Sequence, residues 1–216
     1  MRSSRRGHDV RVVCISDTHL RHGALTVPDG DVLVHAGDLL GHGLVDEVEE
    51  VDLWLAALPH RHKIVIAGNH DWCFEKAPAE AEAALRSATY LRDAGVVIDG
   101  VRFWGSPWQP EFLAWAFNLP RGEPLAERWR LIPDDTDVLV THGPPSGHGD
   151  RCFDGRRVGC EALLAAVRDR VRPRLHVFGH IHEGYGVTRE GGTTFVNASA
   201  CDLDYRPVQP PIVIDL

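Results

Sequence analysis

The chain has 216 residues, of which 44% are hydrophobic and 25% charged, as expected for one globular domain with a substantial core. Its formal net charge of −8 disfavours binding of a nucleic-acid duplex through a basic surface. No run approaches the roughly 20 apolar residues of a membrane span. The arginine-rich segment 1–6 lacks the apolar run of a signal peptide, and five cysteines without a C-x-x-C pair fit a reducing compartment. We therefore predict a cytoplasmic protein without a membrane partner; the oligomeric state is not indicated.

Apolar strands alternate with amphipathic helices along the chain, a pattern typical of α/β proteins. In chain order we predict strands over 12–15 and 32–34, a helix over 45–58, a strand over 64–66, a helix over 79–86, a hairpin over 96–98 and 101–104, a helix over 125–131, a strand over 138–140, a helix over 161–170, and strands over 175–178, 195–196 and 212–214. Residues 107–120 and 143–158 are predicted to be irregular. Because no repeat or linker interrupts the pattern, we predict a single domain over residues 1–216.

Five of the predicted strands end in side chains that can bind a metal ion. The strands lead into Asp17-Thr18-His19, Gly37-Asp38, Gly68-Asn69-His70-Asp71, Thr141-His142-Gly143 and Gly179-His180-Ile181-His182. Open α/β sheets bind their ligands at the carboxyl ends of the strands. One such ending is weak evidence, because a lone histidine or aspartate is common in loops, but five in order predict one shared site.

The candidate ligands combine carboxylate, amide and imidazole groups. They are Asp17, His19, Asp38, Asn69, His142, His180 and His182. Seven ligands exceed the needs of one ion, so two divalent ions that share one carboxylate are the natural arrangement, and Asp38 is the candidate bridge. Such ions lie roughly 3.5–4 Å apart and suit phosphoryl transfer. The absence of a thiolate points to Mn, Fe, Ni, Co or Zn, with Mn favoured, and away from a structural zinc site.

These motifs resemble a known family. D-T-H, G-D, G-N-H-D, T-H-G and G-H-I-H, in this order, are similar to the motifs of the calcineurin-like metallophosphoesterases, and the similarity covers nearly the whole chain. The stretches I-S-D-T-H-L, G-S-P-W-Q-P, W-A-F-N-L-P-R-G and G-H-I-H-E-G-Y-G resemble the MPPED-type phosphodiesterase branch. Purple acid phosphatases and serine/threonine protein phosphatases fit less well, because Gly41 stands where the former have a tyrosine ligand and G-N-H-D replaces the G-N-H-E of the latter.

The resemblance implies a fold and a set of roles. The fold would be a four-layer α/β/β/α sandwich of two mixed sheets flanked by helices. One ion would be held by Asp17, His19, Asp38 and His182, and the other by Asp38, Asn69, His142 and His180. His70 would bind the phosphate and protonate the leaving group, and Asp71 would orient the imidazole of His70.

Substrate choice is predicted to come from the two irregular segments. Trp108 could offer a stacking face for a purine, although aromatic residues in such a stretch are more often part of the core. His148 could reach the site, and Arg151 could grip a phosphate, but a solvated loop is an equal or better explanation for both. The glycines of the 143–158 segment suggest a lid over the leaving group.

We therefore predict a dinuclear metal-dependent phosphodiesterase acting on a small phosphodiester, with a nucleotide or cyclic nucleotide among the candidates. A metal-bridging hydroxide would attack phosphorus in line while His70 assists the departing oxygen. The alternatives are a phosphomonoesterase and a nucleotide- or metal-binding regulatory module without turnover. The intact ligand set and His70 disfavour the module, because binding alone needs no acid beside a metal pair.

Overall fold

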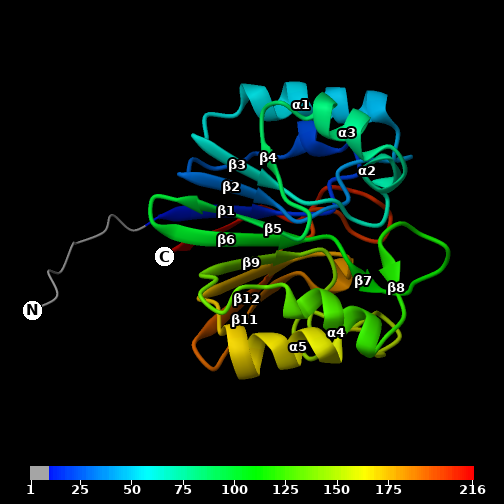
Figure 1. The fold of residues 1–216 in the computed structure, drawn as a ribbon. Coiled ribbons are helices and arrows are strands. Elements are labelled where there is room, and N and C mark those ends of the chain that lie inside the picture. Colours follow the sequence, from blue (N-terminus) through cyan, green and yellow to red (C-terminus); the bar gives the residue numbers. More distant parts are fainter. Residues whose placement is uncertain (1–9) are drawn as a thin grey trace, which may run out of the picture.

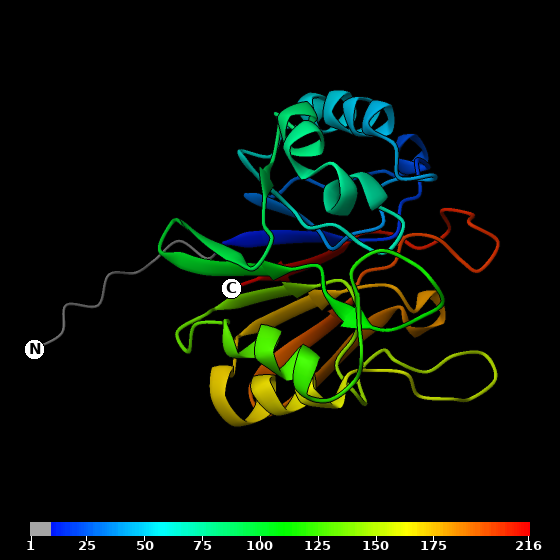
Figure 2. The same cartoon turned by 45° about the vertical axis from the view of Figure 1, so that its right-hand side comes forward.

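The computed structural model describes residues 10–216. The arginine-rich segment 1–6 lies outside the described residues, so the assignment of the whole chain to one domain stays a prediction. Two sheets pack face to face, and helices cover the outer face of each (Figures 1 and 2). This is the predicted α/β/β/α sandwich. Among the described helices, none has the length and apolar character needed to cross a membrane; the cytoplasmic location stays a prediction.

The first sheet combines the first four strands of the chain with the last one. In spatial order its strands are β13 (Ile212–Asp215), β1 (Arg11–Ile15), β2 (Val32–His35), β3 (His62–Val65) and β4 (Thr89–Tyr90). All neighbours pair in parallel except β13, which runs antiparallel to β1. Its outer face is covered by α1 (Val45–Ala57), α2 (Trp72–Lys76) and α3 (Pro78–Ala84), while the 3-10 turn η1 (His22–Ala24) lies in the loop after β1 (Figure 1).

The second sheet has six strands. In spatial order they are β11 (Gly186–Glu190), β12 (Thr193–Asn197), β10 (Leu175–Phe178), β9 (Val138–Thr141), β6 (Val101–Ser106) and β5 (Ala94–Ile98). The central four strands are parallel, and an antiparallel strand closes each edge. The outer face is covered by α4 (Glu123–Arg130), α5 (Glu161–Ala165) and the π-helical η2 (Ala166–Val171). A short pair, β7 (Gln109–Pro110) and β8 (Asn118–Leu119), and the turn η3 (His182–Gly184) complete the fold.

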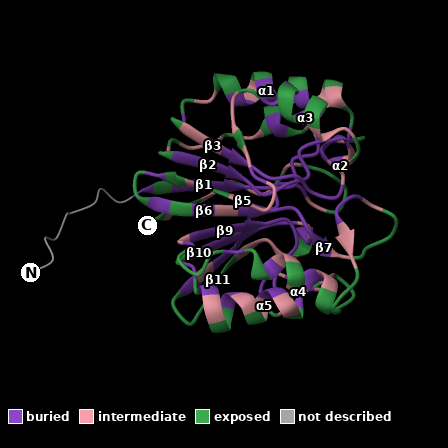
Figure 3. Cartoon of the chain, in the orientation of Figure 1, coloured by how far each residue is buried: buried purple, intermediate pink, exposed green. Residues whose placement is uncertain are grey.

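The central strands are buried on both faces, which explains their nearly continuous apolar sequences (Figure 3). In β1, Val12 and Cys14 belong to the cluster between the two sheets, while Val13 and Ile15 belong to the cluster that includes the helices. The alternation follows from the two-residue period of a strand. A helix that covers the sheet needs one apolar face, and α1 provides it with buried Val48, Val51 and Leu55.

The predicted elements are present with small shifts at their ends. The helix predicted over 45–58 is α1, the hairpin is β5–β6, and the helix predicted over 161–170 is α5 continued by η2. Helix α2, strand β11 and the short pair β7–β8 were not predicted. The 143–158 segment is only partly a surface loop, because Pro145, His148 and Asp150 are buried and only 151–157 project from the protein.

The sandwich brings the carboxyl ends of the parallel strands of both sheets to one edge. An isolated parallel bridge between Ser16, just after β1, and Ser199, just after β12, joins the two sheets there. The loops that follow β1, β2, β3, β9 and β10 are therefore neighbours in space. This edge is where the candidate ligands predicted from the sequence meet.

The packing of α1 gives a first test. Leu55 is fully buried, whereas Leu53 on the same helix is 72% exposed. We expect Leu55→Ala to lower the free energy of unfolding by about 2–5 kcal/mol, because it removes buried methyl groups and leaves a cavity. Leu53→Ala is the matched control and should change it by less than about 0.5 kcal/mol. Urea unfolding measures both, and equal losses would contradict the described helix orientation.

Candidate metal centre

The backbone of the candidate ligands is unusual. Asp17, His19, Asp38 and His180 have positive φ angles of 52°, 42°, 55° and 66°. Such left-handed conformations are uncommon for residues other than glycine and cluster at functional sites. Hydrogen bonds between the loops hold them, since the Asp17 amide donates to the Gly37 carbonyl at 2.9 Å and the His19 amide donates to the Asp38 carbonyl at 3.1 Å. The loops after β1 and β2 thus fix each other's geometry.

One group of potential ligands consists of Asp17, His19 and His182, whose ligand atoms all lie within 4.8 Å of one another. The Ser199 hydroxyl donates to Asp17 Oδ2 at 2.8 Å, which orients the carboxylate. His182 Nδ1 lies 2.9 Å from the Asp202 carbonyl oxygen, which can only accept. The Nδ1 atom therefore carries the proton, and Nε2 of His182 is left facing Asp17 Oδ1 at 3.5 Å.

A second group consists of Asp38, His142 and His180. His142 Nδ1 donates to the Ala36 carbonyl at 2.9 Å, so Nε2 is directed into the site. The side-chain oxygen of Asn69 lies 2.9 Å from this Nε2. The structure therefore brings all seven predicted ligands together at one edge of the sandwich.

Asp38 lies between the two groups. Its Oδ2 atom is 3.8 Å from His19 Nε2 on one side and 3.5 Å from His142 Nε2 on the other. The other oxygen accepts a hydrogen bond from the His70 amide at 2.8 Å. This position fits the predicted role of a shared carboxylate, which stays a prediction.

The buried groups shift one another's pKa. Burial raises the pKa of Asp17 and Asp38, but this is outweighed by neighbouring imidazoles, chiefly His182 for Asp17 and His142 for Asp38, so both pKa values lie below the usual range. Burial lowers the pKa of His142, yet the Asp38 charge raises it to about 9. Burial lowers the pKa of His19 to about 4, so this ring is neutral at pH 7. The ionised carboxylates and the neutral His19 suit a divalent cation, and a cation bound there would displace the proton that Asp38 stabilises on His142.

Two further observations fit a metal centre. Both ring nitrogens of His19 are buried and lack a hydrogen-bond partner among the described residues. A Cβ atom at Gly68 would overlap Asp38 Oδ1, and one at Gly179 would overlap Asp17 Oδ2. The glycines of the G-N-H-D and G-H-I-H motifs are therefore needed for the close approach of backbone to carboxylate. An oxygen and nitrogen donor set with an unsatisfied buried imidazole suits the ions that the sequence predicted.

His70 lies beside the shared carboxylate and is held by aromatic contacts. Its ring stacks on Trp115 at a centroid distance of 4.2 Å and an interplanar angle of 27°. The ring meets His19 edge-on at 4.6 Å. His70 Nδ1 is buried without a hydrogen-bond partner among the described residues, so packing sets the orientation of this imidazole.

The prediction that Asp71 orients His70 is wrong. The fully buried Asp71 carboxylate accepts hydrogen bonds from the backbone amides of Gly68, Leu40 and Leu39 at 2.7, 2.9 and 3.3 Å. These bonds tie the loop after β3 to the loop after β2. Burial, with the charge of Asp38, raises the pKa of Asp71 to about 7. Asp71 is thus a structural anchor of the ligand loops.

Trp108 was predicted as a stacking face, but the structure places it in the core. It packs edge-on against Phe117 at 5.6 Å, and its indole N–H donates to Asp93 at 2.8 Å. Arg128 covers its ring at 4.4 Å. Trp108 therefore cannot serve as a substrate wall.

The aromatic residues at the centre are Phe112, Trp115 and Tyr205, here called the aromatic rim. Besides the contact of Trp115 with His70, Phe112 meets His180 edge-on at 5.6 Å and Tyr205 meets His19 edge-on at 4.7 Å. Phe112 is 49% exposed and Tyr205 is 43% exposed. Sequence reasoning missed Tyr205, although an aromatic residue in the polar stretch D-L-D-Y-R was an available signal.

The other predicted substrate contacts differ in outcome. His148 stacks on Phe195 at 3.8 Å and is hydrogen-bonded to Thr188 and Glu190, so it belongs to the second sheet and does not reach the ligands. Arg151 is exposed at the start of the projecting 151–157 segment, and its phosphate contact stays a prediction. A lid formed by this segment also stays a prediction. The residues that precede the segment are fixed in the fold.

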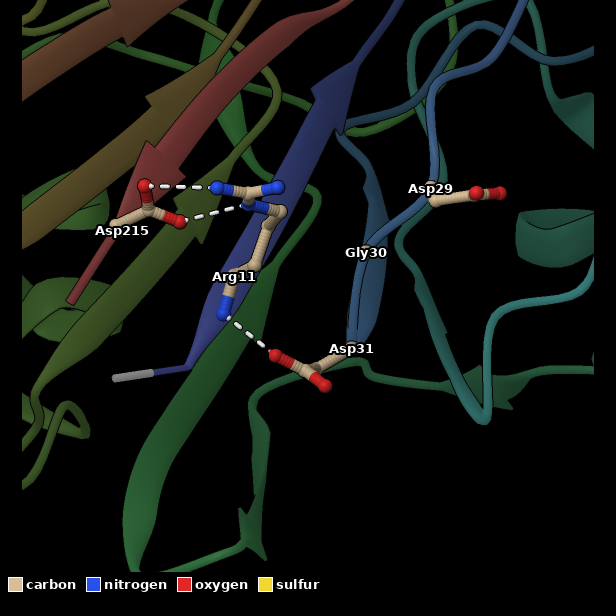
Figure 4. A pocket seen from close by; sticks show the side chains of 5 residues that line it. All are labelled: Arg11, Asp29, Gly30, Asp31 and Asp215. Carbon is tan, nitrogen blue, oxygen red and sulfur yellow. Dashed lines mark hydrogen bonds and ion pairs between the residues drawn. The ribbon is translucent and has the colours of Figure 1, made fainter. Parts of the chain in front are cut away.

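A separate hollow is lined by Arg11, Asp29, Gly30, Asp31 and Asp215 (Figure 4). It lies at the amino ends of β1 and β2, the opposite edge from the ligand loops. Arg11 is already paired with Asp215 at 2.8 Å, and its amide donates to Asp31 at 2.8 Å. Since Arg11 is engaged by Asp215 and Asp31 by a backbone amide, the hollow is a poorer candidate for chemistry than the metal centre.

A model of the calcineurin-like phosphoesterases matches residues 10–184, which is most of the chain. The chain belongs to this family. Metallophosphoesterase domain-containing protein 1 of Homo sapiens is 49% identical over 230 residues, covering 95% of this chain and 71% of that protein. UPF0046 protein C25E10.12 of Caenorhabditis elegans is 42% identical over 228 residues, covering 96% and 81%. The predicted resemblance is confirmed.

Solved structures support the calcineurin-like phosphoesterase fold. The protein TT1561 of Thermus thermophilus aligns with a TM-score of 0.57 at 15% identity over 88% of each chain. Another crystal structure aligns with a TM-score of 0.68 at 17% identity over 96% of this chain and 99% of that one. At these identities the likeness shows the fold alone. Family membership identifies a metal-dependent phosphoesterase and implies a dinuclear divalent metal centre, which agrees with the ligand groups described above.

The anchoring role of Asp71 can be tested by its stability effect. Asp71→Ala leaves three buried amides without their acceptor, each worth about 1–3 kcal/mol, so we expect the free energy of unfolding to fall by roughly 3 kcal/mol or more. His70→Ala should have a much smaller effect, because its ring makes no hydrogen bond to the described residues. Urea unfolding of both variants provides the comparison. A stable Asp71→Ala that shares the catalytic defect of His70→Ala would restore the orienting role.

Proposed function

We propose that this calcineurin-like phosphoesterase is a phosphodiesterase that hydrolyses small diesters with a planar organic group, with nucleotides and cyclic nucleotides among them. The observation that carries this proposal is the aromatic rim, which contacts histidines of both ligand groups. The rim would place an apolar, ring-bearing group next to the phosphorus. Base–aromatic stacking is worth about 1–3 kcal/mol per base.

The ligand groups support the assignment of two ions. Asp17, His19, Asp38 and His182 would hold one ion, and Asp38, Asn69, His142 and His180 the other, with Mn favoured among Mn, Fe, Ni, Co and Zn. When bound, such ions neutralise phosphate charge and lower the pKa of water toward 7. The protein's part is to hold the donors through Ser199, the Asp202 carbonyl and the Ala36 carbonyl, as described above.

His70 is the proposed proton donor to the leaving oxygen. It stands at the shared carboxylate, with its amide on Asp38 and its ring fixed between Trp115 and His19. Its ring makes no hydrogen bond to the described residues that would hold its proton elsewhere. A restrained imidazole next to the phosphate would donate a proton without reorganisation.

The charges at the rim favour a diester over a monoester. A monoester carries an additional negative charge, which a site for monoesters would meet with a free cation. Arg206, next to Tyr205, is instead occupied by Asp202 at 2.7 Å and Asp204 at 2.9 Å. Glu183, which directly follows the ligand His182, adds a further negative charge. A diester with one charge and two organic groups fits this surface better.

The substrate class is tested with metal-reconstituted protein. We expect kcat/KM for bis(p-nitrophenyl) phosphate to exceed that for p-nitrophenyl phosphate by at least about tenfold, or about 1.4 kcal/mol of transition-state free energy. The double variant Phe112→Ala/Tyr205→Ala should narrow this ratio by raising KM for the diester. A higher kcat/KM for the monoester would establish a phosphomonoesterase. If the double variant leaves the diester-to-monoester ratio unchanged, the aromatic rim does not determine the preference.

The role of His70 is tested by the leaving group. We expect His70→Ala to lower kcat by roughly 10²–10⁴-fold for an alkyl ester, the usual size of a general-acid contribution. The loss should be much smaller for a p-nitrophenyl ester, whose leaving group needs no proton. Elemental analysis serves as the control and should show an unchanged metal content. Equal losses on both esters would mean that His70 positions the phosphate and donates no proton.

A further inference from the structure

Two buried threonine–histidine pairs lie just behind the ligand loops. Thr18 Oγ1 is 2.9 Å from His35 Nε2, and Thr141 Oγ1 is 2.9 Å from His176 Nε2. All four side chains are almost fully buried. The metal centre as described above does not use either histidine.

The two pairs occupy equivalent places relative to the ligands. Each threonine directly precedes a candidate ligand, His19 in one group and His142 in the other. Each histidine lies on the adjacent parallel strand, β2 beside β1 and β10 beside β9. The β2 strand continues to Asp38, and the β10 strand continues to His180. Each pair therefore connects two ligand-bearing segments.

Burying these polar pairs inside the sheets lowers the stability of the folded protein. His35 and His176 interrupt the apolar strands V-L-V-H and L-H-V-F, and the Nδ1 atom of each is buried without a hydrogen-bond partner among the described residues. A buried polar atom without a partner destabilises the folded state relative to an apolar side chain. Burial also lowers the pKa of both rings to about 3, so they are neutral and contribute no charge to the centre.

The hydrogen bonds of the second pair have a defined direction. Thr141 Oγ1 donates to the Gly143 carbonyl at 2.9 Å, so it must accept from His176 Nε2–H. This double contact fixes the peptide segment on both sides of His142. Thr18 bonds through its side chain to His35 and stands between Asp17 and His19, which both have left-handed backbones. Rotation of either threonine would displace a ligand.

We propose that His35 and His176 are positioning residues for the metal centre, each fixing through its threonine the ligand histidine that follows. The inference rests on the proposed assignment of two ions to these ligands. The His35 pair acts mainly on the ion held by His19, and the His176 pair acts on the ion held by His142. Interactions outside the ligand shell typically alter metal affinity by 10–100-fold.

The test removes each threonine–histidine hydrogen bond and puts apolar side chains in its place. Thr18→Val/His35→Leu replaces both partners of the first pair, and His176→Leu leaves the bond from Thr141 to Gly143 intact. Mn²⁺ affinity is measured by chelator competition, and stability is measured by the melting temperature of the metal-free protein. We expect each variant to weaken one of the two binding constants by roughly tenfold, with the melting temperature unchanged or raised. Combining the changes should weaken both constants.

Two controls separate positioning from general loosening. His176→Gln should restore the affinity, because its amide nitrogen can donate to Thr141 in place of Nε2. Val177→Ala, a buried neighbour that faces the other sheet, should lower the melting temperature and leave both constants unchanged. The inference is overturned if His176→Leu and Thr18→Val/His35→Leu keep both constants within about twofold of wild type, well below the expected effect. It is overturned equally if Val177→Ala weakens Mn²⁺ binding as much as they do. A wild-type protein that binds fewer than two ions would instead refute the proposed centre.

Discussion

The buried carboxylate of Asp38 is the constraint on which the rest of this edge of the protein depends. An ionised carboxylate in the interior is strongly unfavourable without compensating positive charge. Here its neighbours are His19, His142 and the His70 amide, and Asp17 adds a second buried carboxylate close by. Two divalent ions bound here would neutralise this accumulation of negative charge. Left-handed ligand residues and glycines without room for a Cβ atom are the structural consequences of bringing backbone and carboxylates this close.

The sequence was sufficient for the fold and for the meeting of the candidate ligands at one edge, and the reason is physical. Strands buried on both faces produce apolar runs, and parallel strands deliver their carboxyl ends to one edge, so residues after each run converge without any knowledge of loop geometry. Strand β11 escaped prediction because it is an exposed edge strand with few apolar residues. Helix α2 escaped because five residues cannot show a helical period.

The errors at the site arise where adjacency in sequence differs from adjacency in space. Asp71 follows His70 directly, yet its carboxylate points to the backbone of the neighbouring loops and not to the imidazole. Trp108 and Trp115 lie in one irregular stretch, where no period indicates which side chain faces inward. Trp108 is committed to the core by its bond to Asp93, which leaves Trp115 beside His70. Tyr205 comes from a segment far along the chain, after β12. It lies near Trp115 and His70 only because the sandwich folds these segments together.

At this edge, metal binding and substrate contact are assigned to different structural elements. The ligands stand at the ends of buried strands, where hydrogen bonds to the adjoining loops limit their movement. The aromatic rim stands on irregular segments, between β7 and β8 and between β12 and β13, where side chains can change without disturbing a sheet. Because Trp115 holds His70, this one contact links the aromatic rim to the proposed acid. A change of substrate preference through Trp115 would alter the orientation of the proposed acid as well, whereas Phe112 and Tyr205 contact ligand histidines that the loops already hold. Divergence in substrate choice should therefore proceed through Phe112 and Tyr205 before it reaches Trp115.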